Sequence, residues 1–141
     1  MGLNAVVYRN RKHLKFGPDE KLARLAPDTG EVYFENDQLS RKYRRQLEAV
    51  EHRLGNIAEI SALREEAARL IQPESIVLQK VLYSGTHSGD TIPVQSLSSL
   101  AAEINSINNA SHQSPELRRF VSSLEELIRA AKDEGNPIVF V

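Results

Sequence analysis

Apolar residues recur at helical spacing over residues 39–70, the longest periodic stretch of the chain. A straight helix of about 32 residues would be about 48 Å long, whereas a domain of this size has a diameter of only ~40 Å. We therefore expect this first helix to bend or break, and residues 53–56 are the favoured place. Gly55 is a poor helix former, and Asn56 with Glu59 has the spacing of a capping box. The alternative is a continuous helix in which Gly55 lets another backbone approach closely.

The segments on either side of this helix have mixed strand and helix patterns. Residues 75–83 are apolar on both faces, which is typical of a central strand, and residues 9–30 are mostly loop. The predicted strands cover residues 3–8, 31–34, 75–83 and 138–141, and the later helices cover residues 97–107 and 114–131. The sequence therefore predicts one α+β domain over residues 1–141, in which a small mixed sheet of about four strands packs against three amphipathic helices.

The absence of cysteine excludes disulfides and thiolate metal sites, and it suits a reducing compartment, so we expect a cytoplasmic protein. The first residues lack a signal-peptide pattern, and no stretch approaches the ~18 apolar residues of a membrane span. Hydrophobic residues make up 40% of the chain and charged residues 26%, as in globular proteins. The net charge of −1 makes a general nucleic-acid binder an unfavoured class.

The most unusual motif is the glycine-bracketed loop at residues 84–90. We favour a structural turn in which both glycines adopt positive φ, while contact with a partner or a phosphate ligand is the second interpretation. Catalysis by a histidine and an aspartate is the third, but the loop lacks the spacing of a P-loop or of a nucleophile elbow. The candidate contact residues here are Ser84, Thr86, His87, Ser88 and Asp90.

Metal and cofactor sites are not predicted. A metal site at His87 would need further ligands, but His13, His52 and His112 lie on different predicted elements with no i, i+4 pairing. Adjacent acids on the predicted helices point in different directions and do not form a close carboxylate pair. No catalytic residues are therefore assigned.

A second candidate surface is the basic cluster formed by Arg41, Lys42, Arg44 and Arg45 around Tyr43. Four cations and one aromatic ring could bind RNA through phosphates and a stacked base. On a helix, however, Tyr43 shares the core-facing stripe, so the cations become an ordinary solvated face, which we favour. If Arg41, Arg44 and Arg45 do bind a partner, an acidic protein fits as well as a nucleic acid.

Three motifs, taken together, carry a resemblance to a known group of proteins. They are residues 1–5 (Met, Gly, Leu, Asn, Ala), residues 53–56 (Arg, Leu, Gly, Asn) and residues 83–90, from Tyr83 to Asp90. With these motifs the chain resembles a group of small bacterial proteins that are similar in size and layout to the immunity proteins of polymorphic toxin systems.

The resemblance implies a cytoplasmic, non-catalytic binding protein that neutralises a cognate toxin domain by covering its active site or holding it inactive. Charged patches of both signs are compatible with fast and specific protein association. The net charge of −1 departs from the strongly acidic character expected of a nuclease inhibitor. A small enzyme or phosphate binder using residues 84–90, and an RNA-binding module using Arg41, Arg44 and Arg45, remain the alternatives.

Overall fold

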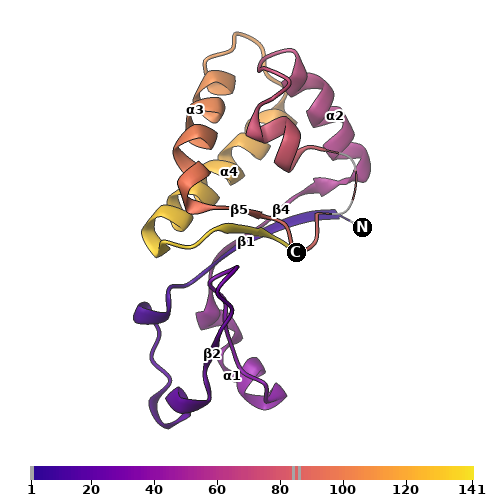
Figure 1. Cartoon of the computed structure of the whole chain (residues 1–141). Helices are drawn as coiled ribbons and strands as arrows, with labels where there is room; N and C mark the ends of the chain where they lie inside the picture. The colour runs from indigo at the N-terminus through magenta and orange to yellow at the C-terminus, as the bar shows by residue number, and fades with distance from the viewer. Residues whose placement is uncertain (1, 84, 86) are drawn as a thin grey trace.

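A computed structural model describes residues 2–83, 85 and 87–141, and its centre is a four-stranded antiparallel sheet with the order β4-β1-β6-β5 (Figure 1). The strands are β1 (Gly2–Tyr8), β4 (Glu48–Asn56), β5 (Thr91–Ile92) and β6 (Ile138–Phe140). The α-helices of the described residues are α1 (Asp37–Leu47), α2 (Ile57–Ala68), α3 (Leu97–Asn108) and α4 (Pro115–Glu134). The predicted α+β class with about four strands is confirmed, but the sheet is antiparallel throughout rather than mixed.

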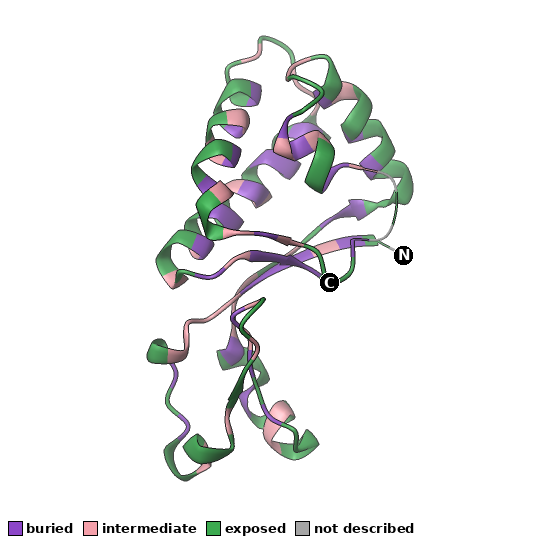
Figure 2. Cartoon of the chain, in the orientation of Figure 1, coloured by how far each residue is buried: buried purple, intermediate pink, exposed green. Residues whose placement is uncertain are grey.

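Helices α2, α3 and α4 cover one face of the sheet and bury the main hydrophobic core against it (Figures 1 and 2). On β1, alternate residues Leu3, Ala5 and Val7 belong to this core, as the period of a strand requires. No helix in the described part of the chain has both the length and the apolar composition needed to cross a bilayer.

Helix α4 forms as the sequence predicts. The Ser114 hydroxyl accepts a hydrogen bond from the Leu117 N–H at 3.0 Å, Pro115 occupies the first turn, and Gly135 ends the helix with a φ of 66°. The whole predicted apolar face is buried: Leu117, Phe120, Val121, Leu124, Leu127, Ile128 and Ala131.

Residues 9–47 form a separate lobe below the sheet (Figure 1). The lobe contains the 3-10 helices η1 (Arg11–His13) and η2 (Gly17–Leu22), the hairpin of β2 (Arg24–Leu25) with β3 (Val32–Tyr33), and α1. It has its own hydrophobic cluster, in which the rings of Phe16, Phe34 and Tyr43 contact one another with centroids 4.8 to 5.2 Å apart. The cluster is completed by Leu14, Val32 and Leu47.

The C-terminal end of α4 fastens this lobe to the sheet. The Glu134 carboxylate accepts a hydrogen bond from the Asn10 N–H at 2.7 Å and lies 2.9 Å from Nδ1 of His13. Just beyond the helix, the Asn136 side chain donates to the Tyr8 carbonyl at 2.7 Å. The lobe is therefore held by specific polar contacts in addition to the chain crossings at β1 and β4.

The predicted helix over residues 39–70 is wrong in its middle, because residues 48–56 form strand β4 between α1 and α2. The β4 strand pairs with β1 along its length, so the long-range hydrogen bonds of the sheet outweigh the local helical spacing. The predicted break is thus a nine-residue strand rather than a kink. The end of the break, where the second helix begins, was predicted correctly. Asn56 and Glu59 form the expected capping box at the start of α2.

Residues 75–83, predicted as the central strand, contain a π-helical segment at Val77–Val81 instead. The Glu103 carboxylate of α3 accepts hydrogen bonds from the N–H groups of Ile76 and Val77, both at 2.9 Å. Val77 and Val81 lie four positions apart and are both fully buried in the main core. The run is therefore apolar because this helical segment packs into the core, and it does not belong to the sheet. The strand in this part of the chain is the short β5, which the sequence analysis missed.

Candidate binding groove

A groove with a volume of about 570 Å³ lies where the start of β1, the start of α2 and the segment after the π-helix meet. Both ends of the chain lie at this edge of the sheet (Figure 1). We call it the edge groove and define it by Leu3, Ile57, Ile60, Leu82, His87 and Val141. It includes part of the loop at residues 84–90 that the sequence singled out.

The walls of the edge groove are mainly apolar. Leu3, Ile60 and Leu82 are buried, whereas Ile57 is 72% exposed and Val141 is 47% exposed at the rim. Ile57 is the most exposed large hydrophobic residue of the described chain. Covering its side chain would contribute roughly 1–2 kcal/mol to binding, so the groove favours an occupant with apolar groups.

His87 lines this groove, and one of its ring nitrogens has no hydrogen-bond partner among the described residues. The residue is only 7% exposed, and its Nδ1 lies 3.1 Å from the Gly85 carbonyl, which can only accept. In the neutral tautomer that fits this contact, Nδ1 carries the proton and Nε2 is left as an acceptor. Nε2 is buried and has no hydrogen-bond partner within the described residues, an arrangement that is unfavourable until a donor reaches it.

The ring of His87 is fixed in place by its neighbours. It lies against the Tyr83 ring at a tilt of 33°, with centroids 3.8 Å apart, and meets the Phe140 ring edge-on at 5.5 Å. The Tyr83 hydroxyl donates to the Asp90 carboxylate, and this hydrogen bond raises the pKa of Tyr83. Gly89 donates its N–H to the Phe140 carbonyl at 2.9 Å, which attaches the loop to β6.

The predicted turn geometry is present, since Gly85 and Gly89 have φ values of 134° and 88°. Ser88 and Asp90 are exposed, while Ser84 and Thr86, also predicted as contact residues, lie outside the described residues. The Asp90 carboxylate is engaged by Tyr83, and no hydrogen bond joins it to His87 in the described part of the chain. The two side chains are thus not arranged as a catalytic pair.

The other histidines do not approach this loop. His13 pairs with Glu134, and His52 lies 2.6 Å from the Glu126 carboxylate of α4. Within residues 2–83, 85 and 87–141, no group of three or more histidine, aspartate and glutamate side chains could hold a metal ion.

Charge at the edge groove is positive. Arg64 of α2 lines it, is exposed and forms no ion pair with the described residues. The positive end of the α2 dipole also faces this region, because Asn56 and Ile57 are lining residues. None of the described residues that line the groove is acidic. An occupant with a carboxylate would therefore find a partner in Arg64.

At the groove, no strand of the described residues pairs with the start of β1 on its β6 side. β6 pairs with β1 only at Ala5 and Val6, and the Val141 N–H donates to the Asn4 carbonyl at 3.0 Å. On the other side, β4 continues to pair with β1 as far as Gly2. No described strand lies beside Gly2 on the β6 side, and Gly2 lines the groove. An extended segment could thus extend the sheet there.

The basic cluster of α1 lies far from the groove, on the lobe below the sheet (Figure 1). Arg41, Arg44 and Arg45 are exposed, while Tyr43 is buried and its hydroxyl donates to the Asp19 carboxylate at 2.7 Å. Its ring is therefore occupied within the lobe and not available for stacking on a base.

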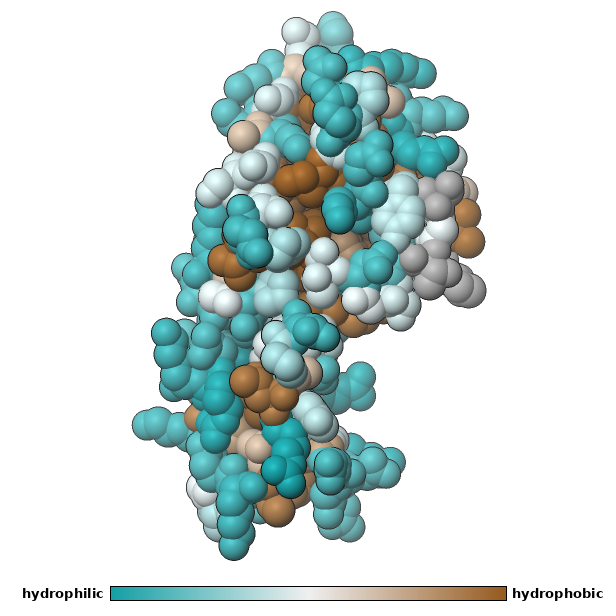
Figure 3. All heavy atoms as spheres, viewed as in Figure 1, coloured by the Kyte–Doolittle hydropathy of each residue, from teal (hydrophilic) through white to brown (hydrophobic). Residues whose placement is uncertain are grey.

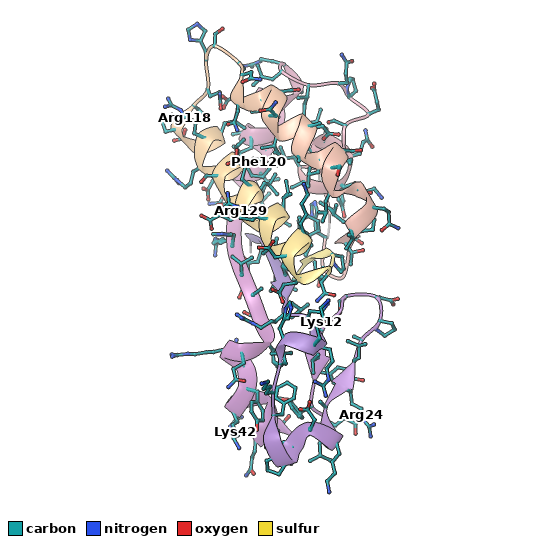
Figure 4. All side chains as sticks on the ribbon, turned by 90° about the vertical axis from the view of Figure 1, so that its left-hand side faces the viewer. Lys12, Arg24, Lys42, Arg118, Phe120 and Arg129 are labelled. Atoms are coloured by element: carbon teal, nitrogen blue, oxygen red, sulfur yellow. The ribbon has the colours of Figure 1, made fainter. Side chains whose placement is uncertain are left out.

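The lobe as a whole carries a net positive charge. Residues 9–47 hold ten lysines and arginines against six acidic residues. Lys12, Arg24 and Lys42 lie on it at separate places (Figure 4), and the face shown in Figure 3 is mainly hydrophilic over this lobe. The structure therefore places the two predicted patches on different parts of the molecule.

Sequence reasoning missed Ile57, Ile60, Arg64 and Val141 as groove residues. The available signal was their spacing, because residues 57, 60 and 64 share one face of a helix. The sequence analysis counted this stretch as part of the first helix, which it expected to bend or break at residues 53–56. Comparisons with protein-family models, with curated proteins and with solved structures find no match for this chain.

Proposed function

We propose that the protein binds an extended segment of a partner protein in the edge groove, and that this binding is its function. The observation that carries the proposal is the exposed Ile57 above apolar walls, at a place where β1 has an unpaired edge. A solvent-exposed isoleucine at the rim of an apolar groove is a typical feature of an interaction surface.

The partner would bind by strand addition. Its main chain would pair with β1 beyond the end of β6, and its side chains would alternate between the sheet surface and the apolar wall formed by Ile60 and Leu82. Main-chain hydrogen bonds would supply affinity, and the pockets for alternate side chains would supply specificity.

The polar groups of the groove define the rest of the partner's chemistry. Arg64 favours a carboxylate on the incoming segment, and a hydrogen-bond donor such as a hydroxyl or an amide would satisfy Nε2 of His87. The favoured occupant is therefore a segment with apolar residues, one acidic residue and one donor side chain.

The biological role that we propose for this binding is immunity against a toxin. The resemblance of residues 1–5, 53–56 and 83–90 to immunity-type proteins supports it, and the first two segments meet at the groove through Gly2, Leu3 and Asn56. Binding of a toxin segment in the groove would cover the active site of the toxin or hold the toxin in an inactive arrangement.

The test is a titration calorimetry measurement with the toxin domain encoded beside this gene. Ile57→Asp should weaken binding by about 100-fold or more, because a charge would be buried against apolar walls. The substitution is compatible with folding, since an acidic residue is favourable in the first turn of α2. Arg64→Glu should weaken binding by about tenfold and change its salt dependence.

Leu22→Asp is the matched control, because Leu22 is 48% exposed at the end of η2 and is not a lining residue of the groove. It should bind as the unsubstituted protein does. Wild-type affinity in Ile57→Asp together with lost affinity in Arg44→Glu would place the partner on α1 and contradict the proposal. Absence of any complex with the toxin domain would contradict the immunity role.

A second candidate function is binding of a small carboxylate-bearing molecule in the same groove. A volume of about 570 Å³ is within the range of ligand sites, and the unsatisfied Nε2 of His87 offers an orienting acceptor. A thermal-shift screen of amphipathic monocarboxylates that also carry a hydroxyl or amide donor for Nε2 tests it. Stabilisation that His87→Phe abolishes would favour this candidate, and a flat screen would dispose of it.

A further inference from the structure

Strand β4 forms an edge of the sheet, and its outer side is open. It pairs with β1 on its inner side only, and no described strand lies beyond it. In Figure 4 it is the long ribbon at the left of the sheet, and α4 packs against it. An open strand edge presents unpaired N–H and C=O groups to any strand of complementary sequence.

The hydrogen bonds of β1 show which main-chain groups of β4 face outward. The Asn4 carbonyl accepts from the Val141 N–H, so Asn4 directs its main-chain groups toward the β6 side. Directions alternate along a strand, so Ala5 directs its groups toward β4, where it lies opposite His52. His52 is therefore bonded inward, and its two neighbours, Glu51 and Arg53, direct their main-chain groups outward.

Two bulges limit the length of this outer edge. The register between β1 and β4 shifts at Leu3/Asn4 and again at Val7/Tyr8, so regular pairing covers only residues 50–53 of β4. Bulges twist an edge away from regular pairing. The usable outer edge is therefore short, and Glu51 and Arg53 carry its outward main-chain groups.

We propose that two copies of this chain pair through the outer edges of β4, antiparallel about a twofold axis at His52. In this register Glu51 of each copy lies opposite Arg53 of the other copy, so the same charge pair forms twice. Each pair would exchange two main-chain hydrogen bonds, and directly opposed residues in an antiparallel ladder are close enough for an ion pair. The sequence around His52 is thus complementary to itself.

Both side chains lie at the protein surface. Glu51 and Arg53 are exposed, and neither forms an ion pair with the described residues. The Arg53 guanidinium packs over Gly2 without a carboxylate partner. Glu51 lies beside Glu48, whose pKa is raised by burial and by this acidic neighbour. A cation from the second copy would relieve the repulsion between the two acids.

Neither Glu51 nor Arg53 lines the edge groove, so pairing through these residues of β4 would leave the groove accessible. Each copy could then hold its own partner segment, giving a complex with two copies of each chain. The dimer contact is independent of the proposed function and is tested separately.

Sedimentation velocity of the purified chain over a range of concentrations tests the dimer. We expect a reversible shift from a 15.8 kDa monomer to a species of twice that mass. Glu51→Arg and Arg53→Glu should each weaken dimerisation by roughly 100-fold, because they place like charges opposite one another. Glu65→Arg, the same change at an exposed position of α2, should dimerise as the unsubstituted chain does.

Charge exchange provides the decisive measurements. The double variant Glu51→Arg/Arg53→Glu should dimerise again, because opposite charges face one another in the reversed order. Mixing the two single variants should yield a heterodimer, because one copy then carries two cations at these positions and the other carries two carboxylates. A chain that stays monomeric at all concentrations would overturn the proposal, as would single variants that dimerise normally or a double variant that stays monomeric.

Discussion

Asn136 packs directly on Gly30, so closely that a Cβ atom on Gly30 would lie 2.2 Å from the Asn136 side-chain oxygen. This contact joins the turn of the β2–β3 hairpin to the segment between α4 and β6. Gly30 also has a φ of 74°, which side chains rarely adopt. The position therefore requires glycine for two independent reasons.

Gly30→Ala should lower the free energy of unfolding by about 2 kcal/mol or more, because the clash adds to backbone strain. Gly17→Ala is the matched control, since Gly17 has a φ of 58° but open space around the added Cβ. It should cost about 1 kcal/mol. Urea unfolding of both variants measures the difference, and equal losses would show that the contact with Asn136 is not tight.

The contact of Glu134 with His13 and Asn10 predicts a dependence of stability on pH. Burial acts to raise the pKa of the Glu134 carboxyl, but the hydrogen bonds from His13 and Asn10 outweigh it and hold the pKa below its ordinary value of 4.5. A lowered pKa in the folded state contributes stability above pH 4.5, and this contribution is lost as the pH falls through the folded-state pKa.

Glu134→Gln should therefore lower stability at pH 7, by about 1 kcal/mol, and should lose less stability than the unsubstituted protein on acidification. Urea unfolding at pH 7 and pH 3 compares the two. Glu65→Gln, at an exposed position without a hydrogen bond among the described residues, is the control and should follow the unsubstituted protein. An identical pH response in Glu134→Gln would contradict the assigned role.

Glu103 should be important for the π-helical segment, because its carboxylate accepts the N–H groups of Ile76 and Val77. Glu103→Ala should cost about 2 kcal/mol, since two partly buried donors lose their acceptor. Glu103→Gln, which keeps one carbonyl oxygen, should have an intermediate effect. Thermal unfolding measures both, and a Glu103→Ala variant as stable as Glu74→Ala, an exposed control, would count against this role.

Tyr8 should ionise only at strongly alkaline pH. Burial, with smaller contributions from Glu31, Glu48 and Glu51, raises its pKa to about 12. The difference between ultraviolet titrations of the protein and of Tyr8→Phe should show one phenol ionising near pH 12. Because the raised pKa disfavours ionisation in the folded state, this residue should reduce stability as the pH rises above 10. A difference curve centred near pH 10 would show that Tyr8 is not buried as described.

The sequence predicts α3 and α4 correctly because both combine long periodicity with local start and stop signals, such as Ser114 and Gly135. It fails at β4 because Val50 and Leu54 fit a helical step of four, while Val50, His52 and Leu54 fit strand alternation equally well. Only pairing with β1, which lies more than 40 residues earlier in the chain, decides between them. No local pattern contains that information.

The dependence on long-range contacts also explains why the sequence predicted only part of the site. The glycine-bracketed loop was recognised from its composition, and its two described glycines have the expected positive φ. Ile57 and Arg64 were not assigned to the site, because their role depends on where α2 begins and on which side of β1 remains open. Both facts are tertiary, so short motifs could not reveal them.

The brevity of β5 has a consequence for how large an assembly of this chain could become. β5 forms the opposite border of the sheet and has only two residues. Growth of a fibre by edge-to-edge pairing of whole sheets needs a long strand at both borders, and the β5 border of this molecule offers only two residues. Association through strands would therefore stop at a closed pair, and the sheet would be protected against open-ended polymerisation.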